Sequence, residues 1–432
     1  MKKRSLLTLA LIVGILMWGC NLMGSDSKDD PAPDPSEDEL TQEAMDDVQT
    51  LITQSGDMDS PDEMIESMTE MDETFDQILT ANPQNYLGNL GKAFTSLFDL
   101  YSNEDVMAVG EYMGSALGSS FNGDMPPLTI MPSLSISKSI ELGDGTVIDE
   151  SEVILNTVIP ALDQAIAYME TAVSNIGSEV IVVMDPDSEE IEIDKSDLMM
   201  ALAVLYGLKG ELHMMVVIDT ELIDPDTGEA LTPDDITMMA DLDEEGLLEI
   251  FMANITPSPD YEGNFLGFKN ETSLPLAKAA FLDCADAFDA FYTNLMAETD
   301  DQENDLISKD NLYLPAEFFS QTEDWLAEGG VIVSISTIPD LVEFIKDVIN
   351  AEVTAVVTIP TDTEEYDLHV TPGAFFDWDT NTTNAFRDFV VEFDEDMLPI
   401  FPQGFDFTLG GILASGDLDA ITIETLLSSM ME

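Results

Sequence analysis

The oxygen-rich segment 377–388 has the spacing of a calcium-binding loop. Asp377, Asp379 and Asn381 occupy alternate positions, and Asp388 stands twelfth when Asp377 is counted as the first residue. Carboxylate and amide oxygens with this spacing are ligands that Ca²⁺ takes in such loops. Thr382 replaces the glycine of the sharp turn, and Asp388 is shorter than the usual glutamate. We treat these four oxygen donors as a candidate calcium site, with a chance match in an acid-rich chain as the alternative.

Other residues that could do chemistry are few. The chain contains no G-x-S-x-G serine motif, no phosphate-binding lysine loop, no H-E-x-x-H and no C-x-x-C. His213 lies in an apolar stretch, His369 ends an expected strand, and Cys284 lies among apolar residues at helical spacing. We expect a hydrogen-bonded histidine, a surface histidine and a small buried hydrophobe, respectively. Pairs of carboxylates carry little information among 88 Asp and Glu. The sequence therefore predicts a protein that is not an enzyme and needs no cofactor, apart from the candidate calcium.

The charge of the chain is strongly negative. It has 88 Asp and Glu against 13 Lys and Arg, which gives a net charge of −75. We do not expect the chain to bind nucleic acid, because each phosphate contact needs a cation that the chain lacks. Three explanations of the acid excess stay open: adaptation to a saline habitat, which we favour, binding of hard cations, and docking to a basic partner.

The N-terminal 19 residues have the features of a secretory signal. Lys2, Lys3 and Arg4 precede an apolar run of residues 5–19 that ends directly before Cys20. A membrane-spanning helix needs about 20 apolar residues, and this run is shorter. An uncleaved signal anchor is the alternative.

The segment Met17-Trp18-Gly19-Cys20 resembles the lipobox of bacterial lipoproteins, although Met17 and Trp18 depart from the usual leucine and small residue. The resemblance implies cleavage before Cys20 and lipid attachment to its sulfur. It also implies a cell-envelope location, and Asn21 in place of aspartate favours the outer membrane. Residues 20–39 are then an acidic, proline-containing tether, extended by charge repulsion.

Helical periodicity dominates residues 40–330. The segment 61–78 places Met64, Met68, Met71, Phe75 and Ile78 on one face. The segment 86–101 follows after Pro83 and places on one face Leu87, Leu90, Phe94, Leu97 and Tyr101. Further helices are expected at 152–175, 196–217, 274–297 and 315–328. The apolar stripe of the first consists of Leu155, Leu162, Ile166, Met169 and Val173, and that of the second consists of Leu198, Leu202, Leu205, Leu212 and Met215. The spacing predicts helical hairpins without a strict period.

The stretch "FDQILTANPQNYLGNLGKAF" resembles the join between two tetratricopeptide repeats. The resemblance rests on Phe75, Pro83, Gly91 and Phe94, and it covers about one repeat. The fold class it implies is mainly α, with tetratricopeptide-like helical hairpins.

Segments between the helices are predicted to form β-hairpins. Alternating residues flank the turns at 143–145, 185–188 and 224–228. From residue 331 to 432 the pattern changes to short strands mixed with short helices, which predicts a small α+β C-terminal portion. The fold class is therefore mainly α with β-hairpin insertions and this final portion.

Location and architecture together predict a non-catalytic role. We expect a lipid-anchored envelope protein that binds another protein or acts as a scaffold, because stacked helical hairpins present surfaces to partners. The alternative is an outer-membrane lipoprotein that captures a solute or glycan for a transporter. Such proteins usually show aromatic platforms, and this chain has only three tryptophans.

Overall fold

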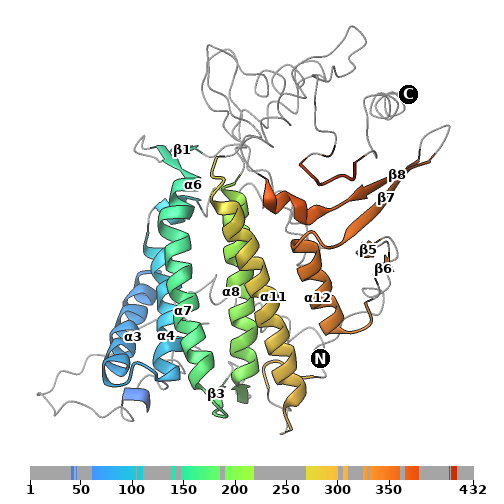
Figure 1. The fold of residues 1–432 in the computed structure, drawn as a ribbon. Helices are drawn as coiled ribbons and strands as arrows, with labels where there is room; N and C mark the ends of the chain where they lie inside the picture. The colour runs from blue at the N-terminus through green and yellow to red at the C-terminus, as the bar shows by residue number, and fades with distance from the viewer. Residues whose placement is uncertain are drawn as a thin grey trace, which may run out of the picture. The chain divides into compact units, whose positions relative to one another are not determined.

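Helices make up most of the described structure. The computed structural model describes residues 40–42, 45, 61–103, 105–109, 139–141, 147–184, 190–217, 269–299, 305–309, 325–327, 331–333, 335–360, 365–378, 408 and 410–415. Helices account for 68% of the interpretable part, and the strands form small antiparallel groups, so the mainly α prediction is confirmed (Figure 1). The bounds predicted for the signal, the tether and the two following portions stay predictions.

The described elements follow one another along the chain with short strand pairs between the helices. The helices are α3 Pro61–Ala81, α4 Tyr86–Phe98, the 3₁₀ turn η1 Asp99–Ser102, α6 Glu150–Val153, α7 Ile159–Asn175, α8 Lys195–Met215, α11 Ser273–Ala297, α12 Ile338–Ile349 and the 3₁₀ helix η4 Pro372–Asp377. The strands are β1 Ser139–Glu141, β2 Val147–Asp149, β3 Ile181–Met184, β4 Glu190–Ile193, β5 Trp325–Ala327, β6 Val331–Ile332, β7 Thr354–Pro360 and β8 Glu365–Val370.

The chain divides into two compact units, which are described separately. The first contains residues 1–107, 157–207 and 286–314, and the second contains residues 108–156, 208–285 and 315–432. The division falls within α8 and within α11, so each of these helices contributes residues to both units.

Helices α3, α4 and α7 form the core of the first unit. α4 packs against both α3 and α7 (Figure 1). The α3 stripe predicted from the sequence is confirmed for Met68, Met71, Phe75 and Ile78, which are all buried. The side chain of Met64 lies outside the described structure.

The buried face of α4 differs from the predicted one. Leu87 is buried, but Leu90, Phe94 and Leu97 are only half-buried. The fully buried positions are mostly small or polar: Gly88, Asn89, Gly91, Lys92, Ala93, Thr95 and Ser96. Two helices approach α4, and small side chains allow both to come close. A Cβ atom added at Gly91 would lie 2.3 Å from ring atoms of Phe75, so this contact requires glycine.

The long helix predicted at 152–175 is interrupted. α6 is followed by a π-helical turn at Ile154–Val158, and α7 then begins with Pro160 in its first turn. Proline has no N–H group to donate to the preceding turn, which favours a break there. The predicted apolar face continues in α7, where Leu162, Ile166, Met169 and Val173 are buried.

Two of the predicted β-hairpins are confirmed. β1 pairs with β2 and β3 pairs with β4, both antiparallel. In β3, Ile181 and Val183 are buried while Val182 is exposed, which is the alternation expected for a half-buried strand. The third expected turn, at 224–228, lies outside the described residues.

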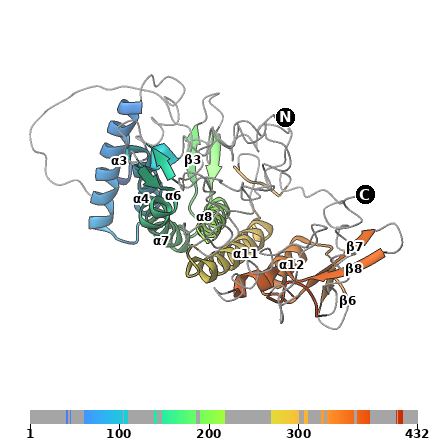
Figure 2. The same cartoon turned by 90° about the horizontal axis from the view of Figure 1, so that it is seen from above.

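The second unit contains a four-stranded antiparallel sheet of order β6-β5-β7-β8. The hairpin of β7 and β8 is its longest pairing (Figure 2). Residues 325–327 form β5, so the prediction of a helix through residue 328 is wrong there. Within β5, Leu326 pairs with Ile332 of β6 and with Thr354 of β7, and this pairing outweighs the local helical pattern.

Helix α12 is fixed at both ends in the second unit. Thr337 and Asp340 form a reciprocal capping box at its start. After its end, Gly373 of η4 lies so close that an added Cβ would be 2.1 Å from the carbonyl oxygen of Val348. This contact seats η4 against α12, with which it packs.

Helix α8 is the one described helix that is long and apolar enough to cross a membrane. Core helices of folded proteins also meet this test. Leu198, Leu202 and Leu205 of α8 are buried in the protein, and its first turn carries the buried polar residues Ser196 and Asp197. These features favour a core helix.

Candidate functional site

The first turn of α8 begins with a reciprocal pair of aspartates. The side chain of Asp194 accepts hydrogen bonds from the backbone N–H groups of Ser196 (2.7 Å) and Asp197 (3.1 Å). In return, Asp197 Oδ2 accepts from the backbone N–H of Asp194 at 2.9 Å. This is the arrangement of a capping box, which satisfies N–H groups that a helix start leaves without partners.

The other oxygen of Asp197 holds a distant segment. Asp197 Oδ1 accepts a hydrogen bond of 3.1 Å from the backbone N–H of Ile307. Next to it, the N–H of Leu306 donates to the carbonyl oxygen of Glu192 in β4 at 3.0 Å. Residues 305–309 are therefore attached both to β4 and to the start of α8.

Glu298, directly after α11, approaches the same place. The Ser196 hydroxyl donates to Glu298 Oε1, and Asn294 Nδ2 donates to Ser196 Oγ at 2.8 Å. Glu298 also forms a side-chain hydrogen bond with Asp194. Lys309 Nζ donates to the backbone carbonyl oxygen of Glu298. We call Asp194, Asp197, Glu298 and Asp305 the carboxyl cluster.

Burial and the charges of neighbouring carboxyl groups raise the pKa values of two members of the carboxyl cluster, Asp197 and Glu298. Burial raises the pKa of Asp197 to about 8, assisted by the charges of Asp194 and Asp305 and opposed by the two backbone N–H bonds. Burial likewise raises the pKa of Glu298 to about 7, again with repulsion from Asp194 and Asp305, while the Ser196 hydroxyl opposes the rise. A hydrogen bond between two carboxyl groups requires one proton between them, which agrees with these directions.

Strongly perturbed carboxyl groups often mark functional sites, so accessibility decides what this cluster can do. Ser196 is 1% exposed and Asp197 is 5% exposed. A substrate cannot reach the Ser196 hydroxyl without a rearrangement of the fold. The cluster is thus suited to binding protons and joining segments.

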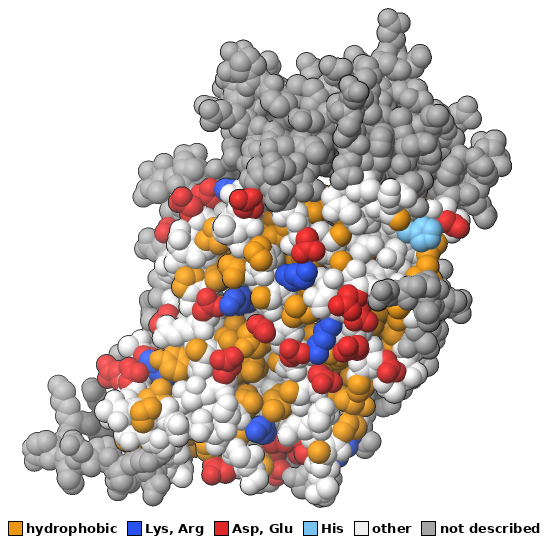
Figure 3. Space-filling model, in the orientation of Figure 1, with side chains coloured by type: hydrophobic (Ala, Val, Ile, Leu, Met, Phe, Trp, Pro, Cys, Tyr) orange, Lys and Arg blue, Asp and Glu red, His pale blue; other side chains and the backbone are white. Residues whose placement is uncertain are grey.

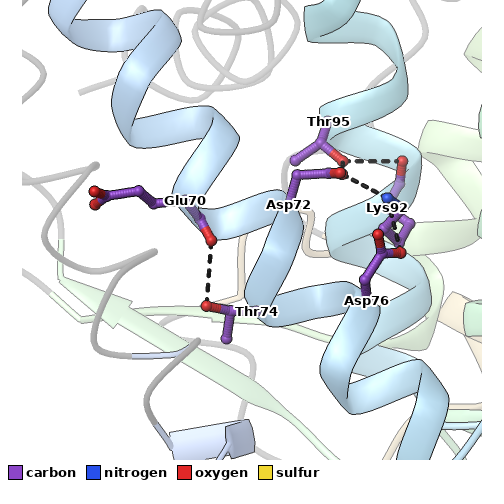
Figure 4. Close-up of polar contacts among 6 residues, drawn as sticks. All are labelled: Glu70, Asp72, Thr74, Asp76, Lys92 and Thr95. Atoms are coloured by element: carbon purple, nitrogen blue, oxygen red, sulfur yellow. Dashed lines mark hydrogen bonds and ion pairs between the residues drawn. The ribbon is translucent and has the colours of Figure 1, made fainter.

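A second polar cluster joins α3 to α4 (Figure 4). The ammonium of Lys92 on α4 lies 2.7 Å from Asp72 and 3.0 Å from Asp76, both on α3, and Thr95 also donates to Asp72. Lys92 is 8% exposed. Although burial opposes its charge, the two aspartates raise the pKa of Lys92. The ammonium therefore stays charged and links the two helices.

The predicted calcium ligands are only partly described. Asp377 lies at the end of η4, is exposed, and stands 3.4 Å from the ammonium of Lys278. Asp379, Asn381 and Asp388 lie outside the described residues. Within the described part of the chain, no group of three or more Asp, Glu, His or Cys side chains could hold a metal ion. The calcium site stays a prediction, and so does lipid attachment at Cys20, which also lies outside.

The two histidines and the cysteine considered in the sequence, His213, His369 and Cys284, are not members of the carboxyl cluster. His213 on α8 is buried, and His369 in β8 is half-buried. Cys284 on α11 is half-buried, so its predicted burial is only partly confirmed.

Reasoning from the sequence missed the carboxyl cluster. The spacing Asp194-x-x-Asp197 before an apolar helix is a capping signal that could have revealed half of it. Glu298 could not have been found in this way, because its partner Ser196 is 102 positions away.

Comparisons of the chain with protein-family models, with curated proteins and with solved structures find no match in any of the three.

Proposed function

We propose that this chain is a lipid-anchored protein of the cell envelope whose helical body binds another protein and has no catalytic role. The observation that carries the binding role is the α3–α4 hairpin packed on α7, with Phe75 against Gly91. These are two of the residues on which the tetratricopeptide resemblance rests, and helical hairpins of that class present surfaces to protein partners.

The use of lysines is consistent with recognition of a partner through acidic groups. Lys92, Lys269 and Lys278 each pair with an aspartate of their own unit. On the face drawn in Figure 3, Asp and Glu side chains are spread over the described surface with the lysines among them, and no basic patch is seen. A partner rich in Lys and Arg would be attracted to such a surface.

The anchor is tested by lipid labelling in a bacterial host. We expect the wild-type chain to incorporate labelled palmitate and Cys20→Ala not to incorporate it. Cys284→Ala is the matched control, since it removes the other cysteine and should still carry lipid. Lipid on Cys20→Ala would refute the anchor.

The binding role is tested by photo-crosslinking in intact envelopes. A crosslinking amino acid at Gln77 of α3 or Gln164 of α7, both exposed, should form a discrete adduct with one protein. The same group at Glu343, exposed on α12 in the other unit, is the control and should not form that adduct. Absence of a protein adduct at both test positions, or the same adducts at all three, would refute the proposed role of the helical hairpin.

A further inference from the structure

The carboxyl cluster joins three parts of the first unit that are far apart in sequence. Asp194 and Asp197 belong to the start of α8, Glu298 follows α11, and Asp305 belongs to the segment 305–309. The bonds from Ile307 to Asp197 and from Lys309 to the Glu298 carbonyl hold that segment in place, together with the bond from Leu306 to Glu192. Two of these three attachments are made to Asp197 and Glu298, whose carboxyl groups belong to the cluster.

The carboxyl groups of Asp197 and Glu298 lie close to other acidic side chains. Asp194 and Asp305 face both Asp197 and Glu298 and repel their ionised forms. The cation of the attached segment, Lys309, donates to a backbone carbonyl oxygen. Lys195 begins α8 next to Asp194 in the chain. Full ionisation would place four carboxylates together in a partly buried space, which is costly.

We propose that the carboxyl cluster is a proton-dependent latch, which holds residues 305–309 against β4 and the start of α8 when it is protonated and releases them when it ionises. This role is separate from the proposed protein-binding function. The raised pKa values of Asp197 and Glu298 agree with such a latch, since both lie well above the ordinary values of their carboxyl groups.

The sign of the pH effect follows from linkage. A carboxyl group whose pKa is raised in the closed state binds its proton more tightly there than in an open, hydrated state. The closed state is therefore favoured at low pH, and its advantage is lost as pH rises from about 4 to about 8. Between those values each of the two protons makes the opening equilibrium up to about tenfold more favourable per pH unit.

Hydrogen exchange of the Leu306 and Ile307 amides tests this on the full chain, at constant high salt and pH 5 to 8. After correction for intrinsic exchange, the logarithm of the opening constant should rise with a slope of about one to two per pH unit. Amides of α7, such as that of Ala165, serve as an internal reference for unfolding of the whole unit and should show a clearly smaller slope.

The variant Glu298→Gln removes one of the two titrating carboxyl groups and so tests the contribution of its proton. Its amide can accept from Ser196 and donate to Asp194, as protonated Glu298 does, so the slope should fall by about one. The variant Glu70→Gln/Glu73→Gln removes two exposed carboxylates of α3 and should retain the wild-type slope. A wild-type slope near zero, or an unchanged slope in Glu298→Gln, would overturn the latch, and the wild-type profile decides even if a variant fails to fold.

Discussion

At the scale of single residues, Lys92 shows how this acid-rich chain uses one of its few cations. Its ammonium is almost fully buried and contacts two carboxylates of the neighbouring helix. A buried charge is tolerated when it is paired and hydrogen-bonded, but the loss of one partner leaves the other uncompensated. Lys92 therefore matters for the stability of the α3–α4 pair far more than a surface lysine would.

Replacing Lys92 by methionine should destabilise the first unit. The side chain keeps its length, but Asp72, which is 30% exposed, loses its counter-ion and so does Asp76. We expect the free energy of unfolding to fall by about 1–3 kcal/mol, the range for removing one partner of a partly buried pair. Urea unfolding followed by circular dichroism measures this.

The matched control is Asp76→Asn. Asp76 is 62% exposed, and an exposed ion pair contributes about 0–1 kcal/mol. If Asp76→Asn costs as much as Lys92→Met, the burial of the ammonium is not what makes the contact important.

The same scale shows the limit of prediction for the site. The Asp194 and Asp197 spacing is local and readable, whereas the raised pKa of Asp197 also depends on Asp305, which the fold brings close. Ser196 would read as an ordinary residue of a first helical turn, and only the fold brings it to Glu298. The sequence predicts the helix cap, but it does not predict which distant residues lie close to Asp197 and raise its pKa.

At the scale of helices and strands, what could be predicted follows local periodicity. The stripes of α3, α7 and α8 are confirmed for most of their described residues, because each helix buries one face at a spacing of three to four residues, although Leu155 and Met215 are only half-buried. The β3–β4 hairpin is confirmed because the two strands predicted on either side of residues 185–188 pair in antiparallel register. The element β5 was missed, because a three-residue strand is fixed by pairing with β6 and β7 rather than by its own residues.

The contact between Phe75 of α3 and Gly91 of α4 gives an element-level prediction. In Gly91→Ala the new methyl group would overlap the ring of Phe75, which is 1% exposed and cannot move into solvent. Overpacking of a core typically costs about 1–3 kcal/mol, and we expect a loss of that size in the free energy of unfolding.

A double-mutant cycle separates this clash from a general helix effect. Gly91→Ala should cost less in a Phe75→Leu background, because leucine leaves room for the methyl group. Gly177→Asn is a control: an added Cβ there meets nothing within 4 Å, and asparagine tolerates its positive φ of 64°. Equal costs of Gly91→Ala in both backgrounds would show that Phe75 is not the constraint.

At the scale of the whole molecule, charge is the dominant property. A net charge of −75 repels itself in the folded state, and mobile ions screen that repulsion. The screening length falls from about 10 Å at 0.1 M salt to about 3 Å at 1 M. The saline-habitat explanation and the calcium explanation of the acid excess differ in which ions are needed.

Thermal unfolding in matched salts distinguishes these explanations. We expect the unfolding midpoint to rise between 0.1 M and 1 M NaCl, by roughly 2–4 °C for each kcal/mol of repulsion removed. Sucrose is the control for solvent effects, since it favours compact states without screening charge. A rise with sucrose but none with NaCl would contradict the dominance of self-repulsion.

CaCl₂ at millimolar concentration should raise the unfolding midpoint no more than NaCl of equal ionic strength does, if screening alone accounts for the stabilisation. An extra rise with calcium that is lost in Asp379→Asn would instead support cation binding at segment 377–388, because that substitution removes a single charge from a chain with 88 acidic residues.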